Sequence, residues 1–165
     1  MSEAGAGGIE VVPFADAHWP SLQGFLRRAF GEDDLRHSRD YFDWRHQNGP
    51  WGSALDAYLL LLHRNEVVGQ LGAMRDRLVV DGVSTPVVWV VDLHVDEEWR
   101  NQMGSLRLLR KLMATEPVLL VSGAGPQVEK LYSSLRFKKV RCHQTLFAPL
   151  RPSALLRAAN RLDGV

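Results

Sequence analysis

The fold is decided by residues 92–106, which read DLHVDEEWRNQMGSL. The first residues of this stretch end the Val-rich run 85–95, which predicts a strand. Asp96 and Glu97 follow as polar residues, and the apolar spacing further on predicts a helix over 102–115. Because the first turn of a helix leaves backbone N–H groups unpaired and carries partial positive charge, this junction predicts an anion site suited to a diphosphate.

The flanking sequence supplies the remaining elements. The patterns predict strands at 9–13, 57–62, 67–80, 118–121 and 137–148, and helices at 18–30, 38–47, 126–136 and 152–162. Asp81-Gly82 is typical of a hairpin turn. The front half predicts antiparallel hairpins, whereas the strand–helix–strand order from residue 85 predicts a parallel pair with a crossover. We therefore expect an α/β (mixed α+β) fold with a mostly antiparallel, twisted central sheet and helices on both faces.

Length and composition fit one globular domain. The chain has 165 residues, of which 45% are hydrophobic and 24% charged, and this excludes a disordered chain or a coiled coil. We expect a leader at 1–8, a single domain at 9–150 and a C-terminal helical extension at 151–165. The leader lacks the basic and apolar regions of a secretory signal, and no apolar run is long enough for a membrane span.

The charge is balanced overall but uneven along the chain. A net charge of +1 predicts no nucleic-acid or membrane partner. Residues 1–60 carry five basic and nine acidic side chains, whereas residues 136–165 carry seven basic and one acidic. The basic end is either a solvated face or a dock for an anion. The single cysteine, Cys142, forms no intrachain disulfide, so we expect a reducing, cytoplasmic environment.

Several chemistries lack their sequence signatures. The six histidines are scattered without metal-ligand spacing, and the lone cysteine has no partner, so we expect no metal. The sequence contains no Gly-x-Ser-x-Gly nucleophile elbow and no Walker loop.

Two motifs resemble the GCN5-related N-acetyltransferase (GNAT) family. The family's strand end, followed by Arg-x-x-Gly-x-Gly or Ala, is similar to Leu93-His94-Val95 followed by Arg100. A gapless alignment places Met103 and Ser105 at the two small-residue positions, whereas a one-residue shift places Gly104 at a glycine position. The family's Leu-Tyr-x-x-x-Gly-Phe is similar to 131–137, with Tyr132 retained and Arg136 at the glycine position.

The resemblance implies a binding slot for acetyl-CoA or another acyl-CoA as co-substrate, with no metal. In this fold the strands at 87–95 and 118–121 splay apart, and the acyl-CoA lies between them. The backbone of Leu93 and Val95 would pair with the pantetheine amides, as an added strand does. The residues expected around the diphosphate are Arg100, Asn101, Gln102, Met103, Gly104 and Ser105.

The resemblance also implies roles in catalysis. Asp92 is the first candidate for the base that deprotonates the amine, and its structural alternatives are a loop cap and an ion pair with an arginine. His94 lies two residues on and shares its face, because side chains alternate along a strand. Tyr132 is the candidate acid for the leaving thiolate. Trp44 and Trp51 are expected in the wall of the acceptor site.

The resulting hypothesis is an acyl-CoA-dependent N-acyltransferase that transfers acetyl to a primary amine of a small molecule by direct attack in a ternary complex. One alternative is a GNAT-fold binding or assembly module without catalysis, suggested by the altered glycine positions. Another is that the chain is one part of a larger two-domain acyltransferase. A partner subunit that supplied a missing strand would make a homodimer. The acidic first third favours a cationic acceptor.

Overall fold

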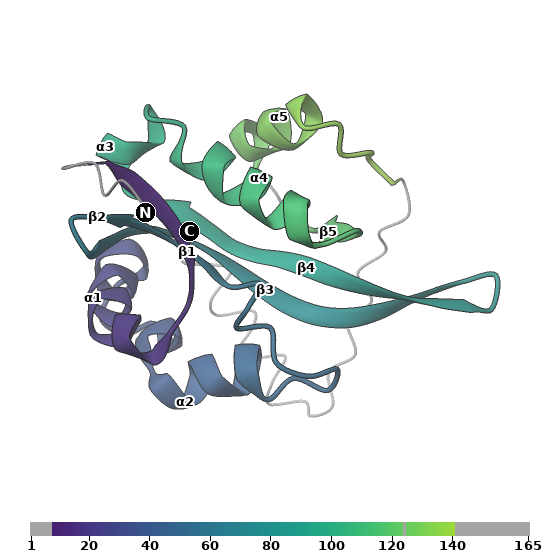
Figure 1. The fold of residues 1–165 in the computed structure, drawn as a ribbon, viewed down its shortest axis with the longest axis horizontal. Helices are drawn as coiled ribbons and strands as arrows, with labels where there is room; N and C mark the ends of the chain where they lie inside the picture. Colours follow the sequence, from purple (N-terminus) through teal and green to yellow (C-terminus); the bar gives the residue numbers. More distant parts are fainter. Residues whose placement is uncertain (1–7, 124, 141–165) are drawn as a thin grey trace, which may run out of the picture. The chain divides into compact units, whose positions relative to one another are not determined.

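The computed structural model describes residues 8–140 except Ala124, and they form one five-stranded sheet in the order β1-β2-β3-β4-β5. The strands are β1 (Ile9–Pro13), β2 (Leu59–His63), β3 (Glu66–Val80), β4 (Val83–Val95) and β5 (Leu119–Val121). The pairs from β1 to β4 are antiparallel, and β4 and β5 are parallel (Figure 1). This confirms the predicted mixed sheet. The chain divides into two compact units, one ending at Val128 and the other beginning at Glu129, and the sheet belongs to the first.

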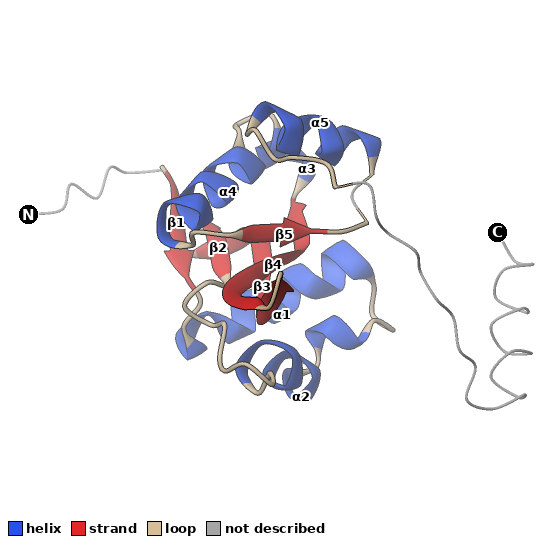
Figure 2. Cartoon of the chain, turned by 90° about the vertical axis from the view of Figure 1, so that its right-hand side faces the viewer, coloured by secondary structure: helices blue, strands red, loops and turns tan. Residues whose placement is uncertain are grey.

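Helices cover both faces of the sheet, as predicted. Figure 2 shows α1 (Trp19–Phe30) and α2 (Arg39–Phe42) on one side and α4 (Gly104–Thr115) on the other. The shorter helical segments are η1 (Asp16–His18), η2 (Leu35–His37), the π-helical η3 (Asp43–Gln47) and α3 (Glu97–Arg100). The remaining helix, α5 (Pro126–Ser134), lies at the boundary between the two units.

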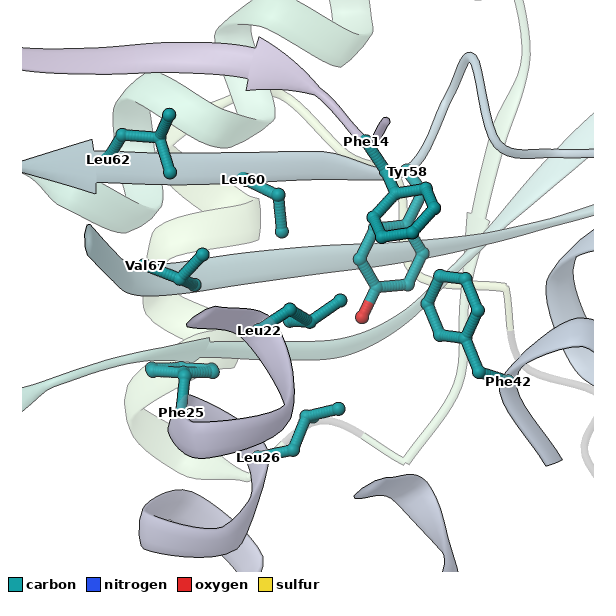
Figure 3. Close-up of a cluster of buried hydrophobic side chains, with 9 residues drawn as sticks. All are labelled: Phe14, Leu22, Phe25, Leu26, Phe42, Tyr58, Leu60, Leu62 and Val67. Carbon is teal, nitrogen blue, oxygen red and sulfur yellow. The ribbon is translucent and has the colours of Figure 1, made fainter. Parts of the chain in front are cut away.

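The core under α1 joins this helix to the sheet. Helix α1 buries Leu22, Phe25 and Leu26, which follow one another at three- and four-residue steps. These side chains form a cluster with six others (Figure 3): Phe14, Phe42, Tyr58, Leu60, Leu62 and Val67. Burying each side chain of this size contributes about 1.5–3 kcal/mol, so the cluster fixes α1 and α2 over β2 and β3.

Strands β3 and β4 continue past their neighbours as a two-stranded ribbon (Figure 1). The turn at Asp81 and Gly82 confirms the predicted hairpin. Both residues have positive φ, +49° and +78°, as a type I′ turn requires. The tip of the ribbon exposes Val79, Val80 and Val83.

Some predicted elements need correction. The helix predicted at 38–47 is a single α-helical turn continued by the wider π-helical η3. The helix predicted at 102–115 begins at Gly104, and the separate helix α3 precedes it.

The predicted strand 137–148 is wrong at 137–140, where the chain has no regular secondary structure. The N–H of Phe137 donates to Tyr132 O at 3.1 Å, so it closes the end of α5 and cannot join a strand ladder. Residues 141–148, the predicted helix 152–162, Cys142 and most of the predicted leader lie outside the described residues.

Candidate active site

A β-bulge interrupts β4 at Asp92. Val91 pairs with Gly72 of β3, and His94 pairs with Gln70. Between these two pairs β4 has two residues, Asp92 and Leu93, whereas β3 has only one. Asp92 has a φ of +48°, a left-handed conformation that costs a non-glycine residue on the order of 1 kcal/mol. No pattern in the sequence had indicated this bulge.

The bulge changes which backbone groups face which neighbour. Val88 N–H donates towards β5, to Val118 O at 3.0 Å, and Asp96 N–H donates towards β3, to Val68 O at 2.9 Å. In a regular strand Val88 and Asp96, an even number of residues apart, would face the same neighbour. The residue inserted at Asp92 therefore reverses the alternation in the last part of β4.

As a result, the backbone of Leu93 and Val95 faces the β5 side of β4. Strand β5 pairs with β4 only from Val88 to Val90, so in the described part of the chain no strand covers the edge beyond Val90. Arg100 Nε donates to Val95 O at 2.8 Å, and the other groups on this edge have no strand partner. Beyond Val90 the edge is thus unpaired in the described residues, although Val95 is only 2% exposed, and an extended ligand pairs with such an edge as an added strand does.

Helix α4 begins beside this open edge with free donors. Its cap, Met103, has a φ of +60° and offers no side-chain hydrogen bond. The N–H groups of Ser105 and Leu106 find no acceptor among the described residues. Asn101 and Gln102 are exposed in the turn that leads to the helix. Such an uncapped helix start is suited to an anion.

Gly104 has a packing role. A Cβ at this position would lie 2.8 Å from Leu61 Cδ2 and 2.9 Å from Val95 Cγ1, so only glycine lets the first turn of α4 rest on β2 and β4. The resemblance places Gly104 among the residues expected around the diphosphate. At Gly104 the space is taken by the sheet. The left-handed φ falls at Met103, which agrees with the gapless alignment of the motif.

Two arginines hold the carboxylate of Asp92. Arg45 Nη1, from η3, lies 2.9 Å from Asp92 Oδ2, and Arg36 Nε, from η2, lies 3.4 Å from Asp92 Oδ1. The side chains of Arg45 and Asp92 are only 17% and 16% exposed. The ion-pair reading of Asp92 therefore describes its surroundings, because each carboxylate oxygen faces an arginine.

Buried polar groups support the bulge from the core. Gln70 Nε2 donates to Asp92 O at 3.3 Å, and its Oε1 accepts from the hydroxyl of Tyr58. The neighbouring His46 bonds Ala73 O at 2.8 Å, and burial lowers the pKa of His46 to about 4. Sequence reasoning missed Arg36, Arg45 and Gln70. A glutamine within an apolar strand was the one available signal.

His94 is packed between aromatic rings of α1. Its ring centroid lies 5.8 Å from that of Phe25 and 5.3 Å from that of Phe30. Burial lowers the pKa of His94, and the charge of Arg100 acts in the same direction. The imidazole is therefore neutral at pH 7 and able to accept a proton.

The two predicted wall tryptophans are both exposed, Trp44 to 65% and Trp51 to 54%. Trp44 lies against Tyr41, with ring centroids 5.6 Å apart, and the Tyr41 hydroxyl accepts from Arg45 Nη1 at 3.0 Å. This chain of contacts links Trp44 to Asp92. No such contact links Trp51 to the bulge.

Tyr132 belongs to the second unit, where it is part of the cap of α5. Arg136 N–H donates to Ser133 O at 3.0 Å and Phe137 N–H to Tyr132 O at 3.1 Å, which is the Schellman pattern. The Tyr132 and Phe137 rings supply its apolar contact, with centroids 5.0 Å apart. Arg136 takes the left-handed position with a φ of +66°, so it keeps the conformation that glycine favours. Burial raises the pKa of Tyr132 to about 12.

A separate hollow of about 730 Å³ contains none of the predicted site residues. Its lining includes Arg28, Glu66 and Asp96, together with the rings of His63 and Trp99, whose centroids lie 4.3 Å apart.

In the described residues, no group of His, Cys, Asp and Glu is arranged to hold a metal ion. No described helix is long and apolar enough to cross a membrane.

Several solved structures with similar folds are acetyltransferases. An aminoglycoside 6'-N-acetyltransferase from Acinetobacter baumannii is 13% identical, with a TM-score of 0.64 over 87% of this chain and 100% of that one. AAC(6')-Iy bound to a bisubstrate analogue containing CoA is 15% identical, with a TM-score of 0.63, and the match covers 87% of this chain and 99% of that one. A GNAT-family acetyltransferase from Staphylococcus aureus is 15% identical, with a TM-score of 0.57 over 81% and 87%.

The chain therefore has the fold of the GNAT acetyltransferases, as its two motifs predicted. No protein-family model matches the sequence, and no curated protein is similar to it. At identities this low, the likeness establishes the fold, and the activity has to be argued from the site.

Proposed function

We propose that the chain is an acyl-CoA-dependent N-acyltransferase that transfers acetyl from acetyl-CoA to a primary amine of a small molecule. The observation that carries this proposal is the open edge of β4, from the bulge at Asp92 to Val95, beside the uncapped start of α4. An acyl-CoA needs both features, an extended edge for its pantetheine amides and free N–H groups for its diphosphate. AAC(6')-Iy, which shares the fold, has been solved with a CoA-containing analogue.

Each part of this edge has a role in binding the co-substrate. Leu93 and Val95 pair with the pantetheine amides through their backbone groups. The N–H groups of Ser105 and Leu106, at the start of α4, bind the diphosphate, which lies against the turn formed by residues 101–103. The Nε of Arg100 donates to Val95 O, and its two Nη atoms place positive charge near the diphosphate.

The chemistry is an attack by the neutral amine on the thioester carbonyl. A C–N bond forms, the C–S bond breaks, the amine loses a proton and the leaving thiolate gains one. A backbone N–H at the bulge, near Leu93, stabilises the oxyanion. Because Asp92 is held by two arginines, we assign proton removal to the neutral His94, acting through water. Asp92 is then a positioning residue.

Tyr132 is proposed as the acid that protonates the thiolate. The phenol is protonated at pH 7, as a proton donor must be, although burial raises its pKa to about 12 and so makes it a weaker acid than an exposed tyrosine. Trp44 and Trp51 are proposed to form the acceptor wall. Homodimer formation and a cytoplasmic location remain part of the hypothesis.

The backbone argues against the non-catalytic alternative. That alternative rests on the residues that replace glycine in the two motifs. Met103 and Arg136 both keep the left-handed backbone conformation that glycine favours. The local geometry therefore survives both replacements.

The test is release of CoA thiol from acetyl-CoA in the presence of a panel of primary amines, with water as the control acceptor. We expect at least one amine to raise the release rate well above the rate in water. His94→Gln should lower the turnover number with little change in the acetyl-CoA KM. Tight acetyl-CoA binding without release by any amine would favour a binding module.

A further inference from the structure

The guanidinium of Arg45 is only partly used by its protein partners. Its Nη1 serves both Asp92 Oδ2, at 2.9 Å, and the Tyr41 hydroxyl, at 3.0 Å. Arginine usually binds a carboxylate through two parallel N–H bonds. Here the other oxygen of Asp92 faces Arg36, so Asp92 cannot engage Arg45 in that way.

The unused donors of Arg45 reach solvent. In the described part of the chain, the one buried side-chain nitrogen or oxygen without a hydrogen-bond partner is Arg36 Nε. The Nε and Nη2 of Arg45 find no acceptor among the described residues, and because neither is a fully buried atom without a partner, both keep some contact with solvent. The hollow beside Asp92 and Tyr58 measures only about 10 Å³, so it is too small to hold an acceptor, and a ligand of Arg45 has to bind at the surface.

The acidic side chains near the site are already neutralised. Asp34 pairs with Arg36 at 2.7 Å, and Asp43 pairs with Arg39 at 2.8 Å. The acidic first third of the sequence favoured a cationic acceptor. In the structure Asp34 and Asp43 are both paired with arginines, and the free hydrogen-bonding capacity at the bulge is that of a donor.

We infer that the acceptor is an amine that also carries a carboxylate, the amino-acid class, and that Arg45 binds this carboxylate. The inference rests on the proposed function. An acceptor lying on the Trp44–Tyr41 pair with its amine at the bulge would place its carboxylate at Nε and Nη2 of Arg45. Asp92 holds the guanidinium in position, and Arg36 faces the other oxygen of Asp92.

The experiment compares amino acids with their amides as acceptors, with a polyamine as a cationic control, by release of CoA thiol. The amide has the less basic amine, so at neutral pH amine reactivity alone favours the amide. We expect kcat/KM to be about tenfold to a hundredfold higher for the acid, the range of one charged hydrogen bond. Arg45→Gln should bring this ratio close to one, and Arg45→Lys should keep part of it.

The matched control is Arg27→Gln, because Arg27 pairs with Glu32 at the surface and should leave the ratio unchanged. The ratio is measured within one variant, so partial loss of folded protein cancels. If Arg45→Gln does not fold, Arg36→Gln tests the same cluster. Turnover restricted to amides or the polyamine would overturn this inference and keep the proposed function. Absence of both acetyl-CoA binding and thiol release would overturn the proposed function itself.

Discussion

Arg45 Nη1 lies 2.9 Å from Asp92 Oδ2 and joins the π-helical segment η3 to the bulge of β4. The two residues are far apart in sequence, and the pair is mostly shielded from water. It ties the proposed acceptor wall to the strand edge on which acyl-CoA is proposed to bind.

The Asp92 ion pairs predict a large loss of stability on truncation. Asp92→Ala leaves two partly buried guanidinium groups without their shared carboxylate, so we expect a loss of about 2 kcal/mol. Urea denaturation measures it. Glu32→Gln, which removes an exposed pair, should change stability by less than about 0.5 kcal/mol. Equal losses of stability in the two variants would show that the Asp92 ion pairs stabilise the fold no more than an exposed pair does.

Gly104 is predicted to accept no side chain. Gly104→Ala places a methyl group against Leu61 and Val95, so we expect a loss of about 1–3 kcal/mol from overpacking and a weaker acetyl-CoA affinity. Gly125→Ala is the control, because nothing lies within 4 Å of a Cβ there. An unchanged unfolding midpoint for Gly104→Ala would contradict the close approach of α4 to the sheet.

The Schellman cap of α5 predicts a stabilising substitution. Arg136 occupies the left-handed position, so Arg136→Gly should raise stability by about 1 kcal/mol. Arg136→Ala keeps the backbone penalty and should stay near the wild-type value. Differential scanning calorimetry of both variants compares them. If alanine stabilised as much as glycine, the cause would be the arginine side chain and not the backbone.

His46 predicts a pH dependence of stability. Its pKa is lowered to about 4 in the folded protein by burial, whereas an unfolded histidine titrates near 6.5. Between these values the unfolded chain binds more protons, so stability is full above pH 6.5 and falls as the pH falls towards 4. We expect a loss of about 2 kcal/mol from pH 7.5 to pH 5, with a smaller part of the same sign from His94.

Urea midpoints at the two pH values measure this loss. His46→Gln, which cannot be protonated in this range, should lose less stability over the same interval. An equal loss in this variant would show that groups other than His46 cause the dependence.

Local patterns were enough to predict much of the fold. Asp81-Gly82 specified its hairpin, and the three- and four-residue spacing of Leu22, Phe25 and Leu26 specified α1, because these signals lie within one element. The strand–helix–strand order after residue 85 similarly specified the parallel pair of β4 and β5.

The rest depended on contacts between distant residues. The bulge at Asp92 is a property of the register between β3 and β4, which no pattern within β4 reveals. The pairing of Arg36 and Arg45 with Asp92 depends on how η2 and η3 lie over the sheet. The packing role of Gly104 was not predicted, because the sequence cannot show that Leu61 and Val95 fill the space beside it.

The most direct test of the central claim is calorimetric titration of acetyl-CoA into the purified full chain, with desulfo-CoA and ADP as comparison ligands. We predict micromolar binding of acetyl-CoA and desulfo-CoA and much weaker binding of ADP, because the pantetheine arm pairs with Leu93 and Val95. Arg100→Met should weaken acetyl-CoA binding about tenfold, whereas Arg110→Met, on the exposed side of α4, should not. No binding at millimolar acetyl-CoA, or equal binding of ADP, would contradict the proposed slot along β4.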